Sequence, residues 1–287
     1  ASQHPPHMPI CRFCKTSAGL LRSLHPECEL KHKVGMSRLR GELAETMLQG
    51  ENSNSLKARL LASNDPSNIS VDEKREAAIT VWEGTVDRFL DDGAIDSGEE
   101  RRLVVYQEQF NLSQSELDRN GVYTKFVKGR TLDDVLRGVI PKRMTVPAAL
   151  PINLQRGESI VWAFSSAQYL EDQNKRTYVG GSHGLSVRIA SGLYYRVSAF
   201  KGEAVNTTVR TAVDRGMVVI TDKNIYFAGP AKSIRVPYVK IVSFQPFTDG
   251  FGIIRDGANT KSQLFITGDG WFTYNLITNL ARLAGEA

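Results

Sequence analysis

Three cysteines and a histidine lie within eighteen positions of one another, in the stretch CRFCKTSAGLLRSLHPEC that runs from residue 11 to residue 28. Cys11 and Cys14 are separated by two residues, and so are His25 and Cys28. Thiolate sulfur and imidazole nitrogen are the donors of tetrahedral zinc sites, and two closely spaced pairs can occupy the four corners. The spacing therefore predicts a zinc centre.

Two short elements have to position these donors. A C-x2-C step predicts a tight knuckle that points both thiolates the same way. Pro26 favours the first turn of a helix, so His25 is expected at the helix cap and Cys28 one turn further. The intervening KTSAGLLRSL is long enough for a small hairpin around Gly19.

This arrangement of knuckle, hairpin and helix resembles a treble-clef zinc finger over roughly residues 9–45, and the resemblance implies that the helix start supplies the last ligands. His32 is an alternative fourth ligand, because Cys28 and His32 lie four residues apart on one helical face. We favour His25, and the sequence leaves both alternatives open.

The predicted zinc ion is structural, because four protein ligands leave no coordination position for a reactive water. Nucleases of the HNH type share the treble-clef scaffold, but they need a further histidine base and an open metal position. Beyond residue 32 the chain has one histidine, His183. We find no motif for a nucleotide, a catalytic nucleophile or a small-molecule substrate. The sequence therefore predicts a protein that is not an enzyme, with nuclease chemistry as the alternative.

Charge is distributed unevenly along the chain. The formal net charge is +5 overall, with +4 over residues 1–60, −6 over residues 61–140 and +7 over residues 141–287. A basic cluster next to the predicted zinc site could neutralise nucleic-acid phosphates. Its members are Arg12, Lys15, Arg22, Lys31, Lys33, Arg38 and Arg40.

Helical patterns follow the zinc-ligand cluster. Met36, Leu39, Leu43 and Met47 recur at helical spacing, so residues 1–50 are expected to comprise the finger and its helix. Gly35 either ends a first helix or lies within a single long one. Residues 51–69 are expected to hold a short helix, in SLKARLLAS (55–63), and a linker, in SNDPSNIS, whose last serine is residue 70.

Residues 70–145 are predicted to be helical, because three stretches place a capping residue three positions before a glutamate, at residues 70–73, 96–99 and 113–116. Helical spacing around Trp82 predicts that this side chain is packed in a core. The stretch DRFLDDGAIDSGEERRLVVYQEQFNLSQSELD resembles the helical repeats of tellurite-resistance (TerB-like) domains, over about residues 70–120. That resemblance implies a bacterial protein of a stress-response or phage-defence system.

From about residue 150 the pattern changes to short β-rich runs separated by turn residues, followed by a helix in GDGWFTYNLITNLARLA. The order of these pieces, with ITDKNIYFAG and PYVKIVSF, is similar to bacterial pleckstrin-homology-like and GRAM-like domains over residues 150–287. The resemblance implies a β-barrel capped by the helix, with a binding role for proteins or lipid head groups. The basic residues that could meet anionic lipid are Lys201, Lys223, Lys232, Arg235 and Lys240.

We therefore expect an α+β multidomain protein with a small zinc finger, a helical middle segment and a C-terminal pleckstrin-homology-like barrel. Its expected role is that of a non-enzymatic zinc-binding adaptor or scaffold for other proteins, with nucleic-acid binding or peripheral lipid binding as alternatives. No apolar run is long enough to span a bilayer, and the start of the sequence does not resemble a secretory signal. We therefore expect a cytoplasmic protein, and because thiols stay reduced in the cytoplasm, its clustered cysteines are interpreted as metal ligands and not as disulfides.

Overall fold

The computed structural model describes residues 9–19, 22–50, 58, 67–144, 150–178, 187–190, 193–195, 204–257 and 261–286, with side chains described except at residues 173–209 and 286. The chain divides into two compact units, residues 1–133 and residues 134–287. The metal-ligand candidates and the three predicted capping stretches all belong to the first unit. The β-rich segment belongs to the second.

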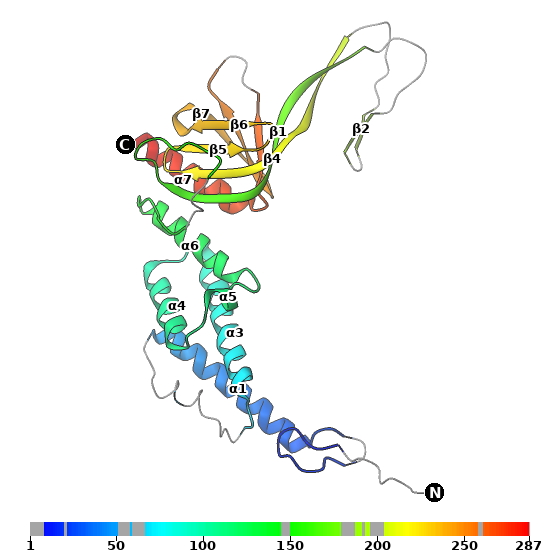
Figure 1. Cartoon of the computed structure of the whole chain (residues 1–287), viewed down its shortest axis with the longest axis vertical. Helices are drawn as coiled ribbons and strands as arrows, with labels where there is room; N and C mark the ends of the chain where they lie inside the picture. The colour runs from blue at the N-terminus through cyan, green and yellow to red at the C-terminus, as the bar shows by residue number, and fades with distance from the viewer. Residues whose placement is uncertain are drawn as a thin grey trace. The chain divides into compact units, whose positions relative to one another are not determined.

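The N-terminal unit consists of helices (Figure 1). Their bounds are α1 Pro26–Gln49, α3 Val71–Phe89, the 3-10 turn η1 Leu90–Asp92, α4 Ser97–Gln109, α5 Gln114–Leu117 and α6 Val122–Leu136, whose last three residues belong to the second unit. α1 continues through Gly35, which is buried, and a Cβ at this position would lie 2.3 Å from the Cβ of Ser67. Gly35 therefore allows the segment at Ser67 to lie close against α1, and it does not end the helix. The short helix expected in SLKARLLAS lies outside the described residues, apart from Ala58.

All three predicted capping boxes are confirmed. In each, the cap side chain accepts a hydrogen bond from the glutamate's backbone N–H, while the glutamate carboxylate accepts one from the backbone N–H of the cap. These reciprocal bonds satisfy N–H groups that a helix start otherwise leaves unpaired. The pairs are Ser70 with Glu73, Asp96 with Glu99, and Ser113 with Glu116.

The core of this unit forms around Trp82, which is fully buried as predicted. Its indole Nε1 donates a hydrogen bond to the Leu103 carbonyl oxygen at 3.2 Å. Leu43 and Met47 of α1 belong to the same hydrophobic cluster. Because α1 contacts both α3 and α4, the long first helix is part of this core along its C-terminal half.

The C-terminal unit contains a seven-stranded antiparallel sheet with the order β6-β5-β4-β1-β9-β8-β7. The strand bounds are β1 Ile160–Tyr178, β4 Ala204–Thr221, β5 Asn224–Ala228, β6 Ser233–Pro237, β7 Ile241–Pro246, β8 Gly250–Arg255 and β9 Gln263–Ile266. A separate hairpin joins β2 Val187–Ala190 to β3 Leu193–Tyr195. β1 pairs with β4 on one side and with β9 on the other.

The described strands do not close into the expected barrel. β6 and β7 lie at opposite edges of the sheet and are not paired with each other in the described part of the chain. The 3-10 turn η2 Tyr238–Lys240 divides the predicted run IRVPYVKIVSF between these two edges. A barrel needs a continuous ladder around its whole circumference, so the barrel prediction was wrong.

β1 and β4 are also far longer than predicted, at 19 and 18 residues. The sequence pattern marked only their apolar ends, SIVWAF and GMVVIT. β1 pairs with β9 only from Gln168 to Glu171, whereas its pairing with β4 continues to Tyr178 opposite Ala204. The two strands therefore extend past the sheet as a two-stranded ribbon (Figure 1).

Helix α7, Gly270–Glu286, packs its apolar face against β7, β8 and η2. Phe272, Leu276, Ile277 and Leu280 are buried, whereas Trp271, which the pattern placed on this face, is 57% exposed. Among the described residues, no helix has the length and apolar character needed to cross a membrane.

Replacing Leu276 with alanine should lower the free energy of unfolding by about 2–5 kcal/mol, because a buried aliphatic side chain leaves a cavity behind. Trp271→Ala is the matched control and should change it by less than about 0.5 kcal/mol, because this side chain is largely exposed. Urea denaturation followed by circular dichroism measures both. Equal destabilisation by the two variants would contradict the packing of α7.

Candidate metal centre

A tight turn positions the first two cysteines. The backbone N–H of Cys11 donates to the Thr16 carbonyl at 2.8 Å, and the N–H of Lys15 donates to the Cys11 carbonyl at 2.9 Å. Lys15 has a positive φ of 61°, a left-handed conformation that is uncommon outside glycine and occurs mostly in turns. An isolated β-bridge between Ile10 and Ser17 closes the base of the turn. The predicted knuckle is thus present, and Cys11 and Cys14 project from it.

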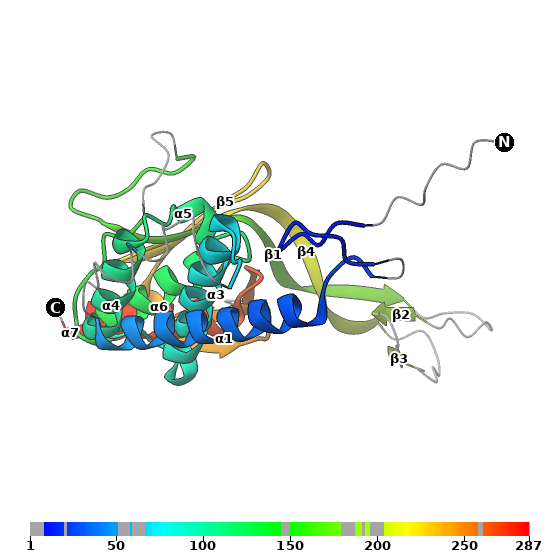
Figure 2. The ribbon, with the colours of Figure 1, turned by 90° about the horizontal axis from the view of Figure 1, so that it is seen from below.

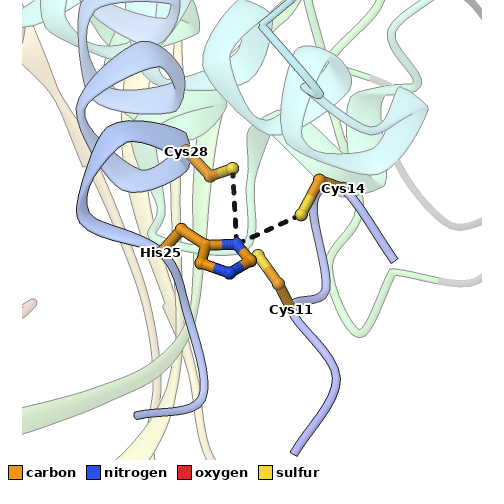
Figure 3. Close-up of side chains that lie close together, drawn as sticks. All are labelled: Cys11, Cys14, His25 and Cys28. Carbon is orange, nitrogen blue, oxygen red and sulfur yellow. Dashed lines mark hydrogen bonds between the residues drawn. The ribbon is translucent and has the colours of Figure 1, made fainter. Parts of the chain in front are cut away.

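The start of α1 positions the second pair. His25 is the N-cap residue, with extended backbone angles of φ −80° and ψ 138°, and Pro26 occupies the first turn. The position of Cys28 one turn into the helix brings its sulfur to the same side as the His25 ring (Figure 3). Both expectations for this helix start are confirmed.

The four side chains converge on one point. Their ligand atoms all lie within 4.8 Å of one another, with His25 Nδ1 at 3.2 Å from Cys14 Sγ and 4.0 Å from Cys28 Sγ. A tetrahedral zinc ion with ligand bonds of about 2.0–2.3 Å places its donors about 3.3–3.8 Å apart. Cys11, Cys14, His25 and Cys28 are therefore close enough to hold a metal ion, and the donor set suits zinc.

Hydrogen bonds around the cluster orient the donors. The Nε2 atom of His25 lies 3.0 Å from the carbonyl oxygen of Ser17. Donation from Nε2 to this oxygen leaves Nδ1 as the lone-pair nitrogen that faces the sulfurs, an arrangement typical of metal-ligating histidines. Thr16 Oγ1 lies 3.0 Å from Cys14 Sγ. The sequence analysis did not identify Thr16 and Ser17 as supporting residues, although both lie within three positions of Cys14.

The surroundings shift the thiol pKa values in opposite directions. The backbone N–H of Cys14, and then those of His25 and Phe13, lower the pKa of Cys11 to about 6. Burial, followed by hydrogen bonds with the other two thiols, raises the pKa of Cys28 to about 11. Hydrogen bonds with Cys11 and then Cys14 raise the pKa of His25 above its usual value. A divalent cation would displace the remaining protons, since it binds thiolate and neutral imidazole.

His32, the alternative ligand, lies apart from this cluster. Its ring stacks on Phe13 at a centroid distance of 4.7 Å, and its Nε2 is 3.2 Å from Glu73 Oε1. Glu73 is also the glutamate of the capping box that begins α3. His32 therefore connects the knuckle to the helical part of the unit, a packing role that its four-residue spacing from Cys28 did not reveal.

All seven basic residues of the predicted nucleic-acid cluster are exposed. Two of them are paired with acids, Lys33 with Glu29 at 2.7 Å and Arg38 with Glu42 at 3.9 Å. On α1 the basic residues form two rows, Lys31 with Arg38 and Lys33 with Arg40, and helical geometry places these rows about 160° apart. The helix thus presents positive charge on two sides.

The four described residues among those proposed for lipid binding do not all gather at one place. Lys223 precedes β5 and Lys232 follows it, so the two lie at opposite ends of that strand. Lys232 is also paired with Glu171 at 3.3 Å. Arg235 and Lys240 are exposed, and Lys201 lies outside the described residues.

Comparisons with known proteins identify no family for this chain: no protein-family model matches it, and no curated protein matches it significantly.

Replacing His25 and His32 by alanine, one at a time, should show which of the two is the fourth zinc ligand. We expect about one zinc atom per chain for the unmodified protein by elemental analysis. His25→Ala should reduce this content sharply after dialysis against a mild chelator, because one of the four donors is removed. His32→Ala should retain it. Zinc loss from His32→Ala with retention in His25→Ala would contradict the observed cluster.

Zinc affinity should rise with pH, because the metal and protons compete for the same donors. Cys28, with a pKa of about 11, keeps its proton through the neutral range, so affinity should increase at least about tenfold per pH unit there. The raised pKa of His25 adds a second competing proton towards the acid side of this range. Below about pH 6 Cys11 is also protonated, and the dependence should become steeper. Competition with a chromophoric chelator between pH 5.5 and 8 measures this slope, and a pH-independent affinity would contradict it.

Proposed function

We propose that this protein is a non-enzymatic, zinc-binding adaptor that binds other macromolecules, with a protein as its principal partner. The observation that supports this most directly is the convergence of four protein donors at one point. Four such ligands complete the coordination sphere of zinc, so the ion would stabilise the fold and would have no position for a reactive water.

The metal would stabilise a part of the chain that has little core of its own. Cys11 is the one fully buried apolar residue among the described positions 9–28. Small units without a sufficient hydrophobic core are commonly stabilised by a structural metal. In our proposal this part is a treble-clef-type finger, and zinc holds its knuckle against the first turn of α1.

The C-terminal unit is, in our proposal, a pleckstrin-homology-like or GRAM-like binding module. Four strands follow one another as β1, β4, β5 and β6, and three more as β7, β8 and β9, with β1 joining the two groups. A C-terminal helix packs on the second group. This order supports the resemblance seen in the sequence even though the described sheet is open.

The proposal for the helical segment is a TerB-like module. It is supported by the sequence resemblance and by the turn at η1, where Gly93 has a φ of 91° and Asp96 begins α4. Such a module would be a second binding unit of the adaptor, in a bacterial stress-response or phage-defence system.

Nucleic-acid binding is the second candidate function, and the exposure of all seven basic residues, around the candidate metal centre and further along α1, favours it. A ligand held by these residues would be a phosphate backbone, and its affinity would fall steeply with added salt. Because the basic rows on α1 face two directions, we place this function second.

Two measurements on full-length protein separate the candidates. Fluorescence anisotropy with labelled single-stranded and duplex DNA, at several salt concentrations, should show no binding tighter than the non-specific range of about 10⁻⁴–10⁻⁶ M. Affinity capture from the protein's own cells should recover a protein partner, and Cys11→Ser/Cys14→Ser should lose any partner that binds the finger.

A variant with altered charge serves as the control for the nucleic-acid candidate. Lys31→Glu/Arg38→Glu changes the charge without touching the metal donors, so it should abolish DNA binding while leaving zinc content unchanged if the second candidate is correct. Salt-sensitive DNA binding that this variant removes would replace the adaptor proposal. Metal-dependent DNA cleavage that is lost in His25→Ala would contradict a non-enzymatic role.

A further inference from the structure

Helix α1 has a second apolar face in addition to the one buried in the core. Six residues recur along it at alternating steps of four and three, the spacing of a coiled-coil seam. They are Leu30, Val34, Ser37, Gly41, Ala44 and Leu48. On an α-helix these positions lie about 160° from the buried residues Gly35, Leu39, Leu43 and Met47.

The large side chains of this seam are exposed. Leu30 is 63% exposed, Val34 61% and Leu48 46%. α3 and α4 contact α1, and Figure 2 shows α1 along the outside of the N-terminal unit. Within the described residues, these three side chains are therefore left to contact solvent or a partner molecule.

Charge along α1 indicates how a matching helix would be oriented. Residues 26–40 contain four basic and two acidic residues, whereas residues 41–49 contain Glu42 and Glu45 and no basic residue. The knuckle and loop before the helix add Arg12, Lys15 and Arg22 to the basic end. Two copies of α1 running in the same direction would place these basic ends together, while opposite directions would place basic ends beside acidic ends.

We propose that the seam is the interface of a homodimer in which two copies of α1 pack antiparallel about a twofold axis near Leu39. The seam is symmetric about this position, so Leu30 meets the partner's Leu48, Val34 meets the partner's Ala44, and Ser37 meets the partner's Gly41. A twofold interface needs one surface that is complementary to itself. Lys31 would lie beside the partner's Glu45.

Two features limit the affinity of this dimer. The small residues Ser37 and Gly41 occupy the centre, so the contact area falls at the low end for stable interfaces. In the register that places Lys31 beside the partner's Glu45, Arg38 would lie beside the partner's Arg38 and Arg40 beside the partner's Arg40, and like charges repel. The dimer should therefore dissociate in the micromolar range. This proposal does not depend on the adaptor function.

Sedimentation velocity of the zinc-loaded, full-length protein tests the interface. We expect a concentration-dependent monomer–dimer equilibrium between about 1 and 200 μM, in line with its modest area. Leu30→Glu/Val34→Glu should raise the dissociation constant at least about tenfold, because it places charges in the apolar seam. Val242→Glu, at a side chain that is 69% exposed in the other unit, is the matched control and should leave it unchanged. A purely monomeric wild-type protein, or equal effects of the two variants, would overturn the proposal.

Cross-linking tests the orientation. Leu30→Cys and Leu48→Cys are prepared separately, loaded with zinc, and oxidised alone and as a mixture, with the unmodified protein as the blank. An antiparallel seam predicts a disulfide-linked dimer chiefly in the mixture, because residue 30 faces the partner's residue 48. Efficient cross-linking of Leu30→Cys with itself would indicate a parallel pair and overturn the antiparallel arrangement.

Arg40→Gln distinguishes the two orientations, because a variant that only damaged the interface could not strengthen association. In the antiparallel dimer Arg40→Gln removes one of the two like-charge contacts and should tighten association several-fold. In a parallel dimer Arg40 would face the partner's Glu45, and the same change should weaken association. Weaker dimerisation of Arg40→Gln would therefore contradict the antiparallel arrangement, even with an intact fold by circular dichroism.

Discussion

The arrangement of the N-terminal unit depends on the coincidence of a helix start with a cluster of metal donors. His25 is at once the N-cap of α1 and one of four side chains whose ligand atoms lie within 4.8 Å of one another. Pro26 holds the backbone of the first turn, so the direction of α1 and the direction of the imidazole are determined together. The same helix then packs on α3 and α4 and presents its second apolar face outward.

Side chains next to the metal donors also connect the knuckle to helices α1 and α3. Phe13 lies between Cys11 and Cys14 in the knuckle and stacks on His32 of α1, which in turn faces Glu73 at the start of α3. Glu73 also belongs to a capping box, so its carboxylate is already held in place. The knuckle is thus connected to two helices through side chains that are not metal donors.

Features that depend on residues close together in sequence could be predicted, whereas features that depend on distant segments could not. The capping boxes, the spacing within each pair of metal donors and the burial of Trp82 all follow from residues within a few positions of one another, where backbone geometry leaves few alternatives. Pairings between distant segments could not be derived in this way. The ribbon of β1 and β4 pairs Tyr178 with Ala204 through mixed polar sequence, so no apolar alternation indicated its length.

The sequence by itself determined that three cysteines could form a metal centre with either His25 or His32, where helices α1, α3, α4 and α5 begin, and that a β-rich unit ends in an amphipathic helix. Only the tertiary structure decided that His32 packs against Phe13 and lies outside the donor cluster, that the described sheet is open, and that Trp271 is exposed. The physical reason is that spacing along the chain specifies which groups can be neighbours locally. Which of several possible neighbours a side chain meets depends on the packing of segments far apart in sequence, and single-chain periodicity contains little information about that packing.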